Sequence, residues 1–387
     1  MINRRALSPT QLKFKMEIIY LILHNFFSFI AIISLIVFIH EFGHFWVARL
    51  CGVQIETFSI GFGKEICGFN DKKGTRWKLC LLPLGGYVKM YGDKNGASMP
   101  DPEEIQKMSA AEKKKSFVFK NVYQRFAIVI AGPVANFLLA IIIFTFLFKI
   151  NGLNSVLPIV DEILPQSAAS ESSLQKGDKI LTINGQEITD FNDVRKIVTI
   201  STDKELRLEI EREKQILQIN ITPKYQVSKD FFGDEIKTGM LGITASQTTH
   251  EDLNIAQSFV QANVETYKTS LLIFEALYEL ITGKRSVKEL GGPIKIAKYS
   301  GQTVTMGITV VAWFMAMISI NLGVMNLLPV PVLDGGHLFF YLIEMIAKKP
   351  LPQKTQQIGF QIGMALVLTL MVFTTFNDVY QLFFGQY

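Results

Sequence analysis

The sequence predicts an α-helical polytopic membrane protein with four transmembrane helices and β structure outside the membrane. Hydrophobic residues make up 49% of its 387 residues, a share that favours a membrane protein over an ordinary soluble enzyme. Four apolar runs, at about residues 17–39, 126–149, 307–330 and 357–376, are each long enough to cross roughly 30 Å of hydrocarbon as a helix. A strongly basic loop lies between the first two runs and indicates their orientation.

The first apolar run follows Arg4, Arg5, Lys13 and Lys15, an arrangement that also begins a secretory signal. No small-residue cleavage site follows the run, and the run is longer than the apolar core of a signal. We therefore predict that it is retained as a transmembrane helix.

The loop at residues 45–125 contains fourteen Lys and Arg, and cytoplasmic loops are enriched in these residues. This pattern places the loop in the cytoplasm, residues 150–306 on the outer side, and the connection at 345–356 in the cytoplasm again. The basic residues before the first run oppose this orientation. Translation from Met16 instead of Met1 would remove them, and N-terminal sequencing decides between the two starts.

The net charge of +5 is accounted for by this orientation signal. No segment combines the clustered basic and aromatic residues of a nucleic-acid surface, so no nucleic-acid partner is predicted. The three cysteines, Cys51, Cys67 and Cys80, fall in the predicted cytoplasmic loop without C-x-x-C spacing. They are predicted to be free thiols and not a second metal site.

At the cytoplasmic end of the first run, residues 40–44 read His-Glu-Phe-Gly-His. Residues four apart share one face of a helix, so His40 and His44 can bind one Zn²⁺ while Glu41 lies beside a metal-bound water. Glu41 would then be the general base in hydrolysis of a peptide bond. The same pattern occurs by chance in unrelated chains, but ionisable residues near membrane depth are costly and mark functional sites.

A catalytic zinc needs a third protein ligand and an open coordination position. Near the end of the third run, residues 326–337 read Asn-Leu-Leu-Pro-Val-Pro-Val-Leu-Asp-Gly-Gly-His, and Asp334 is the predicted third ligand. Pro329 and Pro331 break the helix there, and the two glycines after Asp334 permit close packing. Two alternatives remain at this point: Asp334 as a helix cap, and His337 as the ligand instead.

These residues resemble those of site-2-protease-type intramembrane zinc metalloproteases, and most of all the bacterial regulator-of-sigma-E type. The resemblance covers nearly the whole chain and rests on HEFGHFWVARLCGV (40–53), FSIGFGKE (58–65), LPLGGYVKMYGD (82–93), AGPVANF (131–137), GGPIKIA (291–297) and NLLPVPVLDGGHL (326–338). It implies that His40, His44 and Asp334 bind one zinc ion per chain. It also implies that Glu41 is the catalytic acid/base and that Asn326 holds the substrate or the oxyanion, a role suited to a side-chain amide. The alternative for Asn326 is a structural amide that bonds backbone carbonyls between helices.

Within the cytoplasmic loop, residues 61–63 and 82–89 read as short strands separated by a turn at 70–74. They predict a cytoplasmic, membrane-associated β-hairpin, and the resembling family has a membrane-dipping β element here. A helical transmembrane substrate must be unwound before attack, and its extended chain can be added to a strand edge. A purely structural hairpin that closes the cytoplasmic mouth is the alternative.

The outer segment has strand-like runs between about 155 and 225, the sequence LQKGDKILTINGQ at 174–186, and a candidate helix near 190–200. It resembles one periplasmic PDZ-like β-rich domain of the protease-associated kind, which implies substrate recognition or size exclusion. A spacer with a degenerate groove is the alternative. Residues 254–281 predict an amphipathic helix on the outer membrane surface, or else a connector.

The predicted domain organisation therefore has five parts. They are residues 1–125 with the first transmembrane helix, the His-Glu-x-x-His motif and the β-hairpin; 126–150 with the second transmembrane helix; 151–228 as the PDZ-like domain; 229–306 as a periplasmic connector with an amphipathic helix; and 307–387 with the third and fourth transmembrane helices and the Leu-Asp-Gly motif.

The predicted function is an intramembrane zinc metalloprotease that cuts single-span membrane proteins within their transmembrane segments, in contact with membrane lipid. The resemblance implies a multi-pass protein of the bacterial inner membrane, substrates such as anti-sigma factors or remnant signal peptides, and a site-1 protease acting upstream. Two alternatives come from other classes: a catalytically silent PDZ scaffold and a metal-ion transporter. The complete set of ligands with Glu41 opposes the scaffold, and four spans without two matching halves oppose the transporter.

Overall fold

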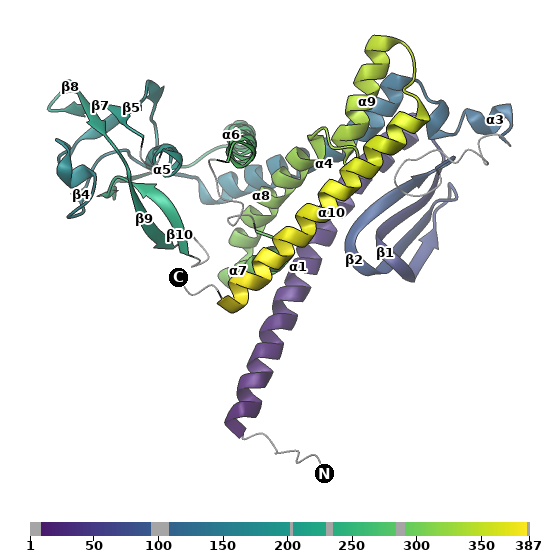
Figure 1. The fold of residues 1–387 in the computed structure, drawn as a ribbon, viewed down its shortest axis with the longest axis horizontal. Helices are drawn as coiled ribbons and strands as arrows, with labels where there is room; N and C mark the ends of the chain where they lie inside the picture. Colours follow the sequence, from purple (N-terminus) through teal and green to yellow (C-terminus); the bar gives the residue numbers. More distant parts are fainter. Residues whose placement is uncertain (1–8, 94–107, 202–203, 230–234, 284–290, 385–387) are drawn as a thin grey trace. The chain divides into compact units, whose positions relative to one another are not determined.

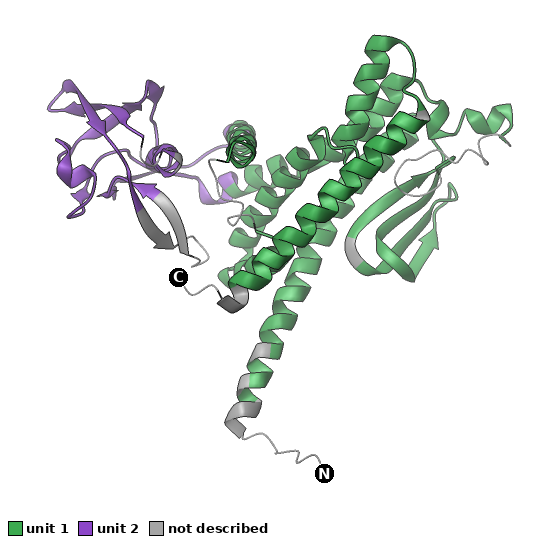
Figure 2. Ribbon diagram, viewed as in Figure 1, with its two compact units in different colours: residues 1–147, 259–386 green, residues 148–258, 387 purple. Residues whose placement is uncertain are grey.

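The structure is a computed structural model that describes residues 9–93, 108–201, 204–229, 235–283 and 291–384 (Figure 1). Arg4 and Arg5 of the basic N-terminal segment lie outside the described residues. The chain divides into two compact units, one formed by residues 1–147 and 259–386 and the other by residues 148–258 with 387 (Figure 2). The first unit contains the long apolar helices, and the second is rich in β structure.

Among the described residues, four helices are long and apolar enough to cross a membrane. They are α1 (Pro9–Leu50), α4 (Val122–Asn151), α8 (Ile308–Leu327) and α10 (Gln353–Phe384). Each contains or overlaps one of the predicted apolar runs, as a polytopic membrane protein requires. Helix α1 is much longer than its apolar run, because the helix continues through the His-Glu-x-x-His segment to Leu50.

Two shorter helices flank α8 in the membrane unit. Helix α7 (Pro293–Met306) precedes it and packs against α1 and α10, and α9 (Asp334–Ala347) follows it. The start of α7 is fixed by Asp378 of α10, whose buried carboxylate accepts hydrogen bonds from the backbone N–H groups of Gly292, Ile294 and Lys295. The first N–H groups of a helix have no partner within it, so this side chain from another helix satisfies them.

The predicted β-hairpin is present as β1 (Ile55–Asn70) and β2 (Arg76–Met90), joined by a turn at residues 71–75. Both strands are longer than the runs predicted from the sequence. Residues 57–60 of β1 pair with residues 86–89 of β2 and also with residues 76–79. The first half of β1 therefore lies between two segments of β2, and the hairpin forms a folded sheet with a buried side.

Aromatic side chains pack this sheet onto α1. The ring of Phe58 is fully buried and lies 5.4 Å from the ring of Phe45 of α1 and 4.3 Å from the ring of Trp77, centroid to centroid. Such contacts bury large apolar areas in favourable ring geometry. The sheet is therefore held against the end of α1 that carries the His-Glu-x-x-His motif.

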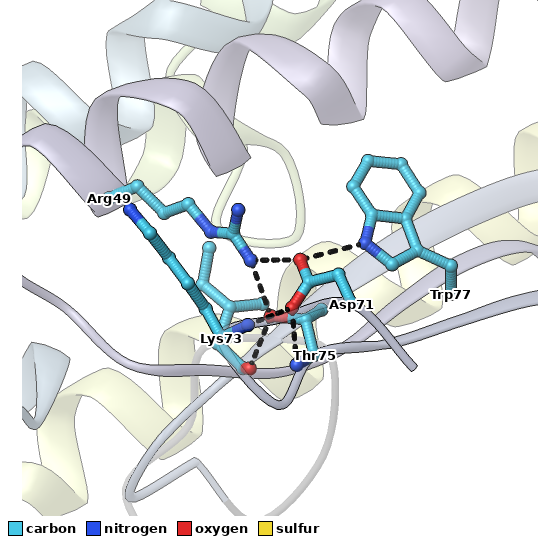
Figure 3. Close-up of polar contacts among 6 residues, drawn as sticks. Arg49, Asp71, Lys73, Thr75 and Trp77 are labelled. Atoms are coloured by element: carbon cyan, nitrogen blue, oxygen red, sulfur yellow. Dashed lines mark hydrogen bonds and ion pairs between the residues drawn. The ribbon is translucent and has the colours of Figure 1, made fainter. Parts of the chain in front are cut away.

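The turn of the hairpin is tied to the last turn of α1 by Asp71 (Figure 3). Its carboxylate accepts hydrogen bonds from the guanidinium of Arg49, from Nε1 of Trp77 at 3.1 Å, and from the backbone N–H groups of Lys73 at 2.8 Å and Thr75 at 3.0 Å. Arg49 also donates to Oγ1 of Thr75 at 2.9 Å. Burial raises the pKa of Asp71, but these hydrogen bonds outweigh it and hold the pKa well below its usual range.

The second unit is built on a four-stranded sheet in the order β6-β5-β7-β8. Its strands are β5 (Lys179–Ile183), β6 (Gln186–Glu187), β7 (Leu206–Arg212) and β8 (Gln215–Ile221). Ile180, Leu208 and Ile210 from this sheet are fully buried in the core of the unit. The candidate helix near residues 190–200 is α5 (Phe191–Ile200), which Asp190 caps through the backbone N–H of Asn192 at 2.6 Å.

The second unit extends past residue 228, where the sequence placed the end of the PDZ-like domain. After β9 (Lys224–Lys229) and β10 (Glu235–Met240), the strands β11 (Ile243–Thr244) and β12 (Thr248–Glu251) return to the start of the unit. There they pair with β4 (Glu162–Ile163) and β3 (Leu153–Val156), respectively. Strand pairing between the two ends of the segment therefore sets the extent of the unit at residues 148–258.

Helix α6 (Ile255–Ile281) occupies the region predicted as an amphipathic helix. It exposes several large apolar side chains, among them Phe259, Val260, Val264, Tyr267 and Leu271. Its position on the membrane surface remains a prediction.

Candidate metal centre

The two histidines of the His-Glu-x-x-His motif lie on one face of α1, one helical turn apart. Both are buried, at 7% exposure for His40 and 8% for His44. Their Nε2 atoms approach each other to 3.3 Å, with the rings at 86° to one another. This follows from the four-residue spacing, which places both imidazoles over the same side of the helix.

Asp334 reaches the histidines because the chain turns sharply between α8 and α9. Helix α8 ends at Leu327, and the segment that contains Pro329 and Pro331 forms short-range hydrogen bonds until α9 begins at Asp334. A Cβ atom on Gly335 would overlap the carbonyl oxygen of Leu328, and one on Gly336 would overlap Pro331. The sequence Asp-Gly-Gly therefore permits a turn tight enough to bring the Asp334 carboxylate to the face of α1.

The three predicted ligands converge on one point. Oδ2 of Asp334 lies 3.1 Å from Nε2 of His40 and 3.3 Å from Nε2 of His44. Among the described residues, these three side chains form the group whose donor atoms could hold a metal ion together. Ligand atoms bound to zinc at tetrahedral positions are roughly 3.3–3.5 Å apart, so the observed separations fit that ion.

The donor chemistry also fits a cation. Two imidazole nitrogens and a carboxylate oxygen present lone pairs to one another at close range, which is unfavourable in a buried site without a cation or a proton between them. Two neutral ligands and one anionic ligand leave positive charge on a divalent ion, which then acts as a Lewis acid. The side chains of His40, His44 and Asp334 therefore form a group that could bind zinc, in which Asp334 occupies the place predicted for the third ligand.

Helix α4 supports the histidines from behind. Nδ1 of His44 lies 2.9 Å from the carbonyl oxygen of Ile128, and Nδ1 of His40 lies 3.1 Å from Nδ2 of Asn136. A Cβ atom on Gly132 would lie 2.5 Å from Cε1 of His44 and 2.9 Å from Cε1 of His40, so only glycine fits against the two rings.

Neither Gly132 nor Asn136 was predicted from the sequence to be part of the site, although both belong to the AGPVANF stretch on which the resemblance rests. The available signal was a polar amide in the middle of an apolar run, since polar side chains at membrane depth are costly and have functional or packing roles.

The start of α4 also holds α9 in place. The guanidinium of Arg125 donates to Oε1 of Glu344 at 2.6 Å and lies 4.9 Å from the centre of the Tyr341 ring. Both partners are on α9, the helix that begins with Asp334. This charged contact therefore fixes the helix that begins with the predicted third ligand.

Glu41 lies between the metal group and the β sheet. It interacts electrostatically with His40, His44 and Asp334. On its other side is Gly86 of β2, where an added Cβ atom would lie 3.0 Å from Cγ of Glu41 and 2.8 Å from the carbonyl oxygen of Ser59. The predicted general base therefore sits where an extended strand of the hairpin meets the metal group.

The other two candidates from the sequence, Asn326 and His337, lie near the two ends of the turn between α8 and α9. Asn326 is half-buried in the last turn of α8, eight residues before Asp334, and its role in binding substrate or oxyanion stays a prediction. His337 is in the first turn of α9 with its ring 6.4 Å from that of Tyr341. It is not part of the converging metal group of the described residues.

Comparison with known proteins identifies the family to which the chain belongs. The model of peptidase family M50 matches residues 28–370, a range that includes every proposed metal ligand and Glu41. A protein of Agrobacterium fabrum named a putative zinc metalloprotease is 41% identical over 355 residues, which cover 91% of this chain and 94% of the relative. Proteins with the same designation from Rhizobium meliloti and Rickettsia conorii are 39% and 41% identical, cover 92% of this chain each, and are themselves covered to 96% and 98%.

Proposed function

This chain belongs to peptidase family M50 and is a zinc metalloprotease of the membrane, and we propose that it hydrolyses peptide bonds within the transmembrane segments of other membrane proteins. The observation that carries the proposal is the position of the metal group. His40, Glu41 and His44 lie within the candidate membrane span at residues 15–50. Glu41 lies just after the apolar run at residues 17–39, so a scissile bond that reaches it would lie at the cytoplasmic end of that membrane-spanning segment.

The residues of the site have separate roles in hydrolysis. His40, His44 and Asp334 would hold zinc, which when bound supplies a Lewis acid that polarises the scissile carbonyl and makes water more acidic. The carboxylate of Glu41 accepts a proton from the attacking water and returns it to the departing amine. The amide of Asn326 donates a hydrogen bond to the oxygen that gains negative charge, as an oxyanion donor.

The hairpin provides a way to present the substrate in extended form. Residues 86–89 of β2 pair on one edge with β1, and within the described part of the chain no strand pairs with their other edge. Gly86 of this segment lies against Glu41. A substrate strand added along β2 would place its peptide bonds next to the general base after the helix has been unwound.

The second unit suits a role in recognition outside the catalytic centre. Three apolar residues, Ile197 of α5 and Ile243 and Ala245 of the β11 region, pack on its core while remaining partly exposed. We propose that this unit acts as a PDZ-type module that receives an extended part of the substrate.

The physiological setting is proposed on the resemblance noted from the sequence. We place the protein in the bacterial inner membrane, with the hairpin in the cytoplasm and the β-rich unit in the periplasm. The proposed substrates are single-span proteins, of the anti-sigma-factor or remnant signal-peptide class, after a first cut outside the membrane by a site-1 protease.

The test uses purified full-length protein in lipid vesicles with a tagged single-span substrate that lacks its outer domain. Wild type, Glu41→Gln and a chelated sample are compared, with Glu187→Gln, an exposed glutamate of the second unit, as the matched control. We expect wild type and Glu187→Gln to cut inside the transmembrane segment, as located by mass spectrometry. Glu41→Gln should retain zinc and lose cleavage by at least about 100-fold, the lower range for a general base.

Two outcomes would contradict the proposal. Cleavage confined to residues outside the apolar segment would show a protease acting at the membrane surface and not within it. Full activity of Glu41→Gln would assign the proton transfers to another group.

A further inference from the structure

Both imidazoles of the metal group have the same orientation. Their Nε2 atoms face Asp334, and their Nδ1 atoms face α4. A neutral imidazole carries one proton, and the nitrogen that binds a metal must be the one without it. Zinc binding therefore requires both histidines to carry their proton on Nδ1, and α4 must provide an acceptor for each.

For His44 this acceptor is already in place. The atom next to its Nδ1 is a backbone carbonyl oxygen, that of Ile128, which can only accept a hydrogen bond. The carbonyl thus holds the proton on Nδ1 of His44 and leaves Nε2 free for the metal.

For His40 the neighbour on α4 is a side-chain amide, which can either donate or accept. In the structure Nδ2 of Asn136 lies 3.1 Å from Nδ1 of His40. An N–H of Asn136 donating to Nδ1 would place the proton of His40 on Nε2, toward Asp334, where it would block the metal. A half turn of the amide about the Cβ–Cγ bond exchanges its nitrogen and oxygen and reverses the hydrogen bond.

Two further facts favour the reversed arrangement when metal is bound. Asn136 is fully buried, and its Oδ1 has no hydrogen-bond partner among the described residues. A buried carbonyl oxygen without a donor is costly, and Nδ1–H of His40 is a donor within reach. The same turn of α4 is fixed from the other side, since the hydroxyl of Ser319 donates to the backbone oxygen of Asn136 at 2.9 Å.

We propose that Asn136 is a positioning residue of the metal centre, whose side-chain oxygen accepts the Nδ1 proton of His40 and thereby holds Nε2 in the metal-binding form. This inference rests on the proposed function, because it concerns the same metal group. The side-chain oxygen of Asn136 then accepts the Nδ1 proton of His40, just as the carbonyl oxygen of Ile128 accepts that of His44. The two histidines are thus oriented by one helix, α4, through one backbone and one side-chain acceptor.

The test compares full-length wild type with Asn136→Asp, which keeps an oxygen acceptor, and with Asn136→Leu and Asn136→Ala, which remove it. Thr145→Val is the matched control, because Thr145 is a buried polar residue of α4 whose hydroxyl bonds Ile141 of its own helix at 2.7 Å. Zinc affinity is measured by competition with chelators. Folding is checked by size-exclusion and by thermal unfolding of the metal-free proteins.

We expect Asn136→Leu and Asn136→Ala to lose zinc affinity by about 10–100-fold, the range for loss of a hydrogen-bond partner of a metal-binding histidine. The zinc affinity of Asn136→Asp should stay within about threefold of that of wild type, because this variant keeps an oxygen acceptor. The zinc affinity of Thr145→Val should stay within the same range. If Asn136 had a purely structural role, its variants would have lower thermal stability, and the zinc affinity of Asn136→Asp would not differ from that of the two apolar variants. Equal zinc affinity in all folded variants would overturn the proposal.

A second measurement needs no variant at position 136. In zinc-loaded protein labelled with ¹⁵N-histidine, the proton of His40 is expected on Nδ1, with a hydrogen-bonded shift, and the assignment comes from loss of the signal in His40→Ala. A proton on Nε2 of His40 in the zinc-loaded protein would overturn the inference while leaving the metal site intact. Failure of wild type to bind zinc would instead contradict the proposed function itself.

Discussion

Gly86 of β2 lies so near Glu41 of α1 that a side chain at residue 86 would crowd the glutamate. An added Cβ atom would come within 3.0 Å of Cγ of Glu41 and 2.8 Å of the carbonyl oxygen of Ser59, both tighter than ordinary packing allows. The backbone of the hairpin can therefore lie directly beside the proposed general base. This relationship links strand presentation of a substrate to proton transfer.

Gly86→Ala is expected to lower cleavage by at least about tenfold while zinc content is unchanged, because small displacements of a catalytic group are costly in rate. Cleavage of the single-span substrate and bound zinc are measured on the same samples. Gly291→Ala serves as the control, since its added Cβ would meet only the flexible side chain of Lys295 at 3.1 Å. Unchanged cleavage by Gly86→Ala would show that the strand does not fix the position of Glu41.

Gly132→Ala is expected to lower zinc affinity without displacing Glu41. Its methyl group would overlap the imidazole of His44 and press on that of His40, so the two Nε2 atoms could not converge. We expect zinc affinity to fall by more than about tenfold, as for other losses of ligand orientation. Gly323→Ala is a matched control from α8, whose Cβ would come no closer than 3.1 Å to the Phe137 ring. Retention of zinc by Gly132→Ala would contradict the tight packing of α4 on the histidines.

Asp71→Asn is expected to loosen the hairpin from α1. The change removes the charge that pairs with Arg49 and weakens the hydrogen bonds shown in Figure 3, which should cost about 1–3 kcal/mol of stability. Faster proteolysis between residues 55 and 90 measures the loosening. A double-mutant cycle with Arg49→Gln should show that the two changes are not additive. Additive effects would mean that the two side chains act independently.

The same pair predicts a pH dependence with a definite sign. The pKa of Asp71 is lowered in the folded protein, so its contribution to stability is complete above the unfolded pKa of about 3.9 and declines as the pH falls toward the folded value. The stability difference between wild type and Asp71→Asn should therefore be larger at pH 7 than at pH 3. A difference that grows on acidification would contradict the assigned direction of the shift.

Asp178→Asn is expected to destabilise the β-rich unit without affecting zinc. Asp178 is fully buried and accepts hydrogen bonds from Nε of Arg212 at 2.7 Å, from its Nη2 at 2.8 Å and from the backbone N–H of Gln175 at 2.8 Å. Loss of the charge leaves the guanidinium poorly compensated, which should cost about 2–3 kcal/mol. Hydrogen exchange of the amides in β5 and β7 reports the loss. Asp252→Asn, an exposed carboxylate, is the control, and equal exchange in both variants would contradict the role of the pair.

Much of this molecule follows from local sequence pattern. The four spans are apolar runs whose length alone fits a membrane, and the spacing of His40 and His44 places them on one helical face whatever surrounds them. Asp334 was predicted as the third ligand because an acid among apolar residues is costly unless it is paired or binds a cation. The turn of the hairpin was predicted because its polar and glycine residues separate two apolar segments.

Other features could not be predicted because they depend on packing between distant segments. The β-rich unit extends beyond residue 228 because β11 and β12 pair with β4 and β3, 80 to 98 residues earlier in the chain. The roles of Gly86, Gly132 and Asn136 depend on which helix or strand lies against α1, and nothing in their local sequence specifies that neighbour.

The apolar spans, the metal-binding chemistry and the helical face that bears the two histidines were predictable from the sequence, since each depends on residue type and spacing within one segment. How close the elements come, and which atoms they present to one another, depends on the packed fold. Two features of this kind are the approach of Asp334 to within 3.3 Å of both histidines and the contacts of both imidazoles with α4. Close packing and buried hydrogen bonds are set by contacts among distant segments, and the order of residues along one helix does not specify those contacts.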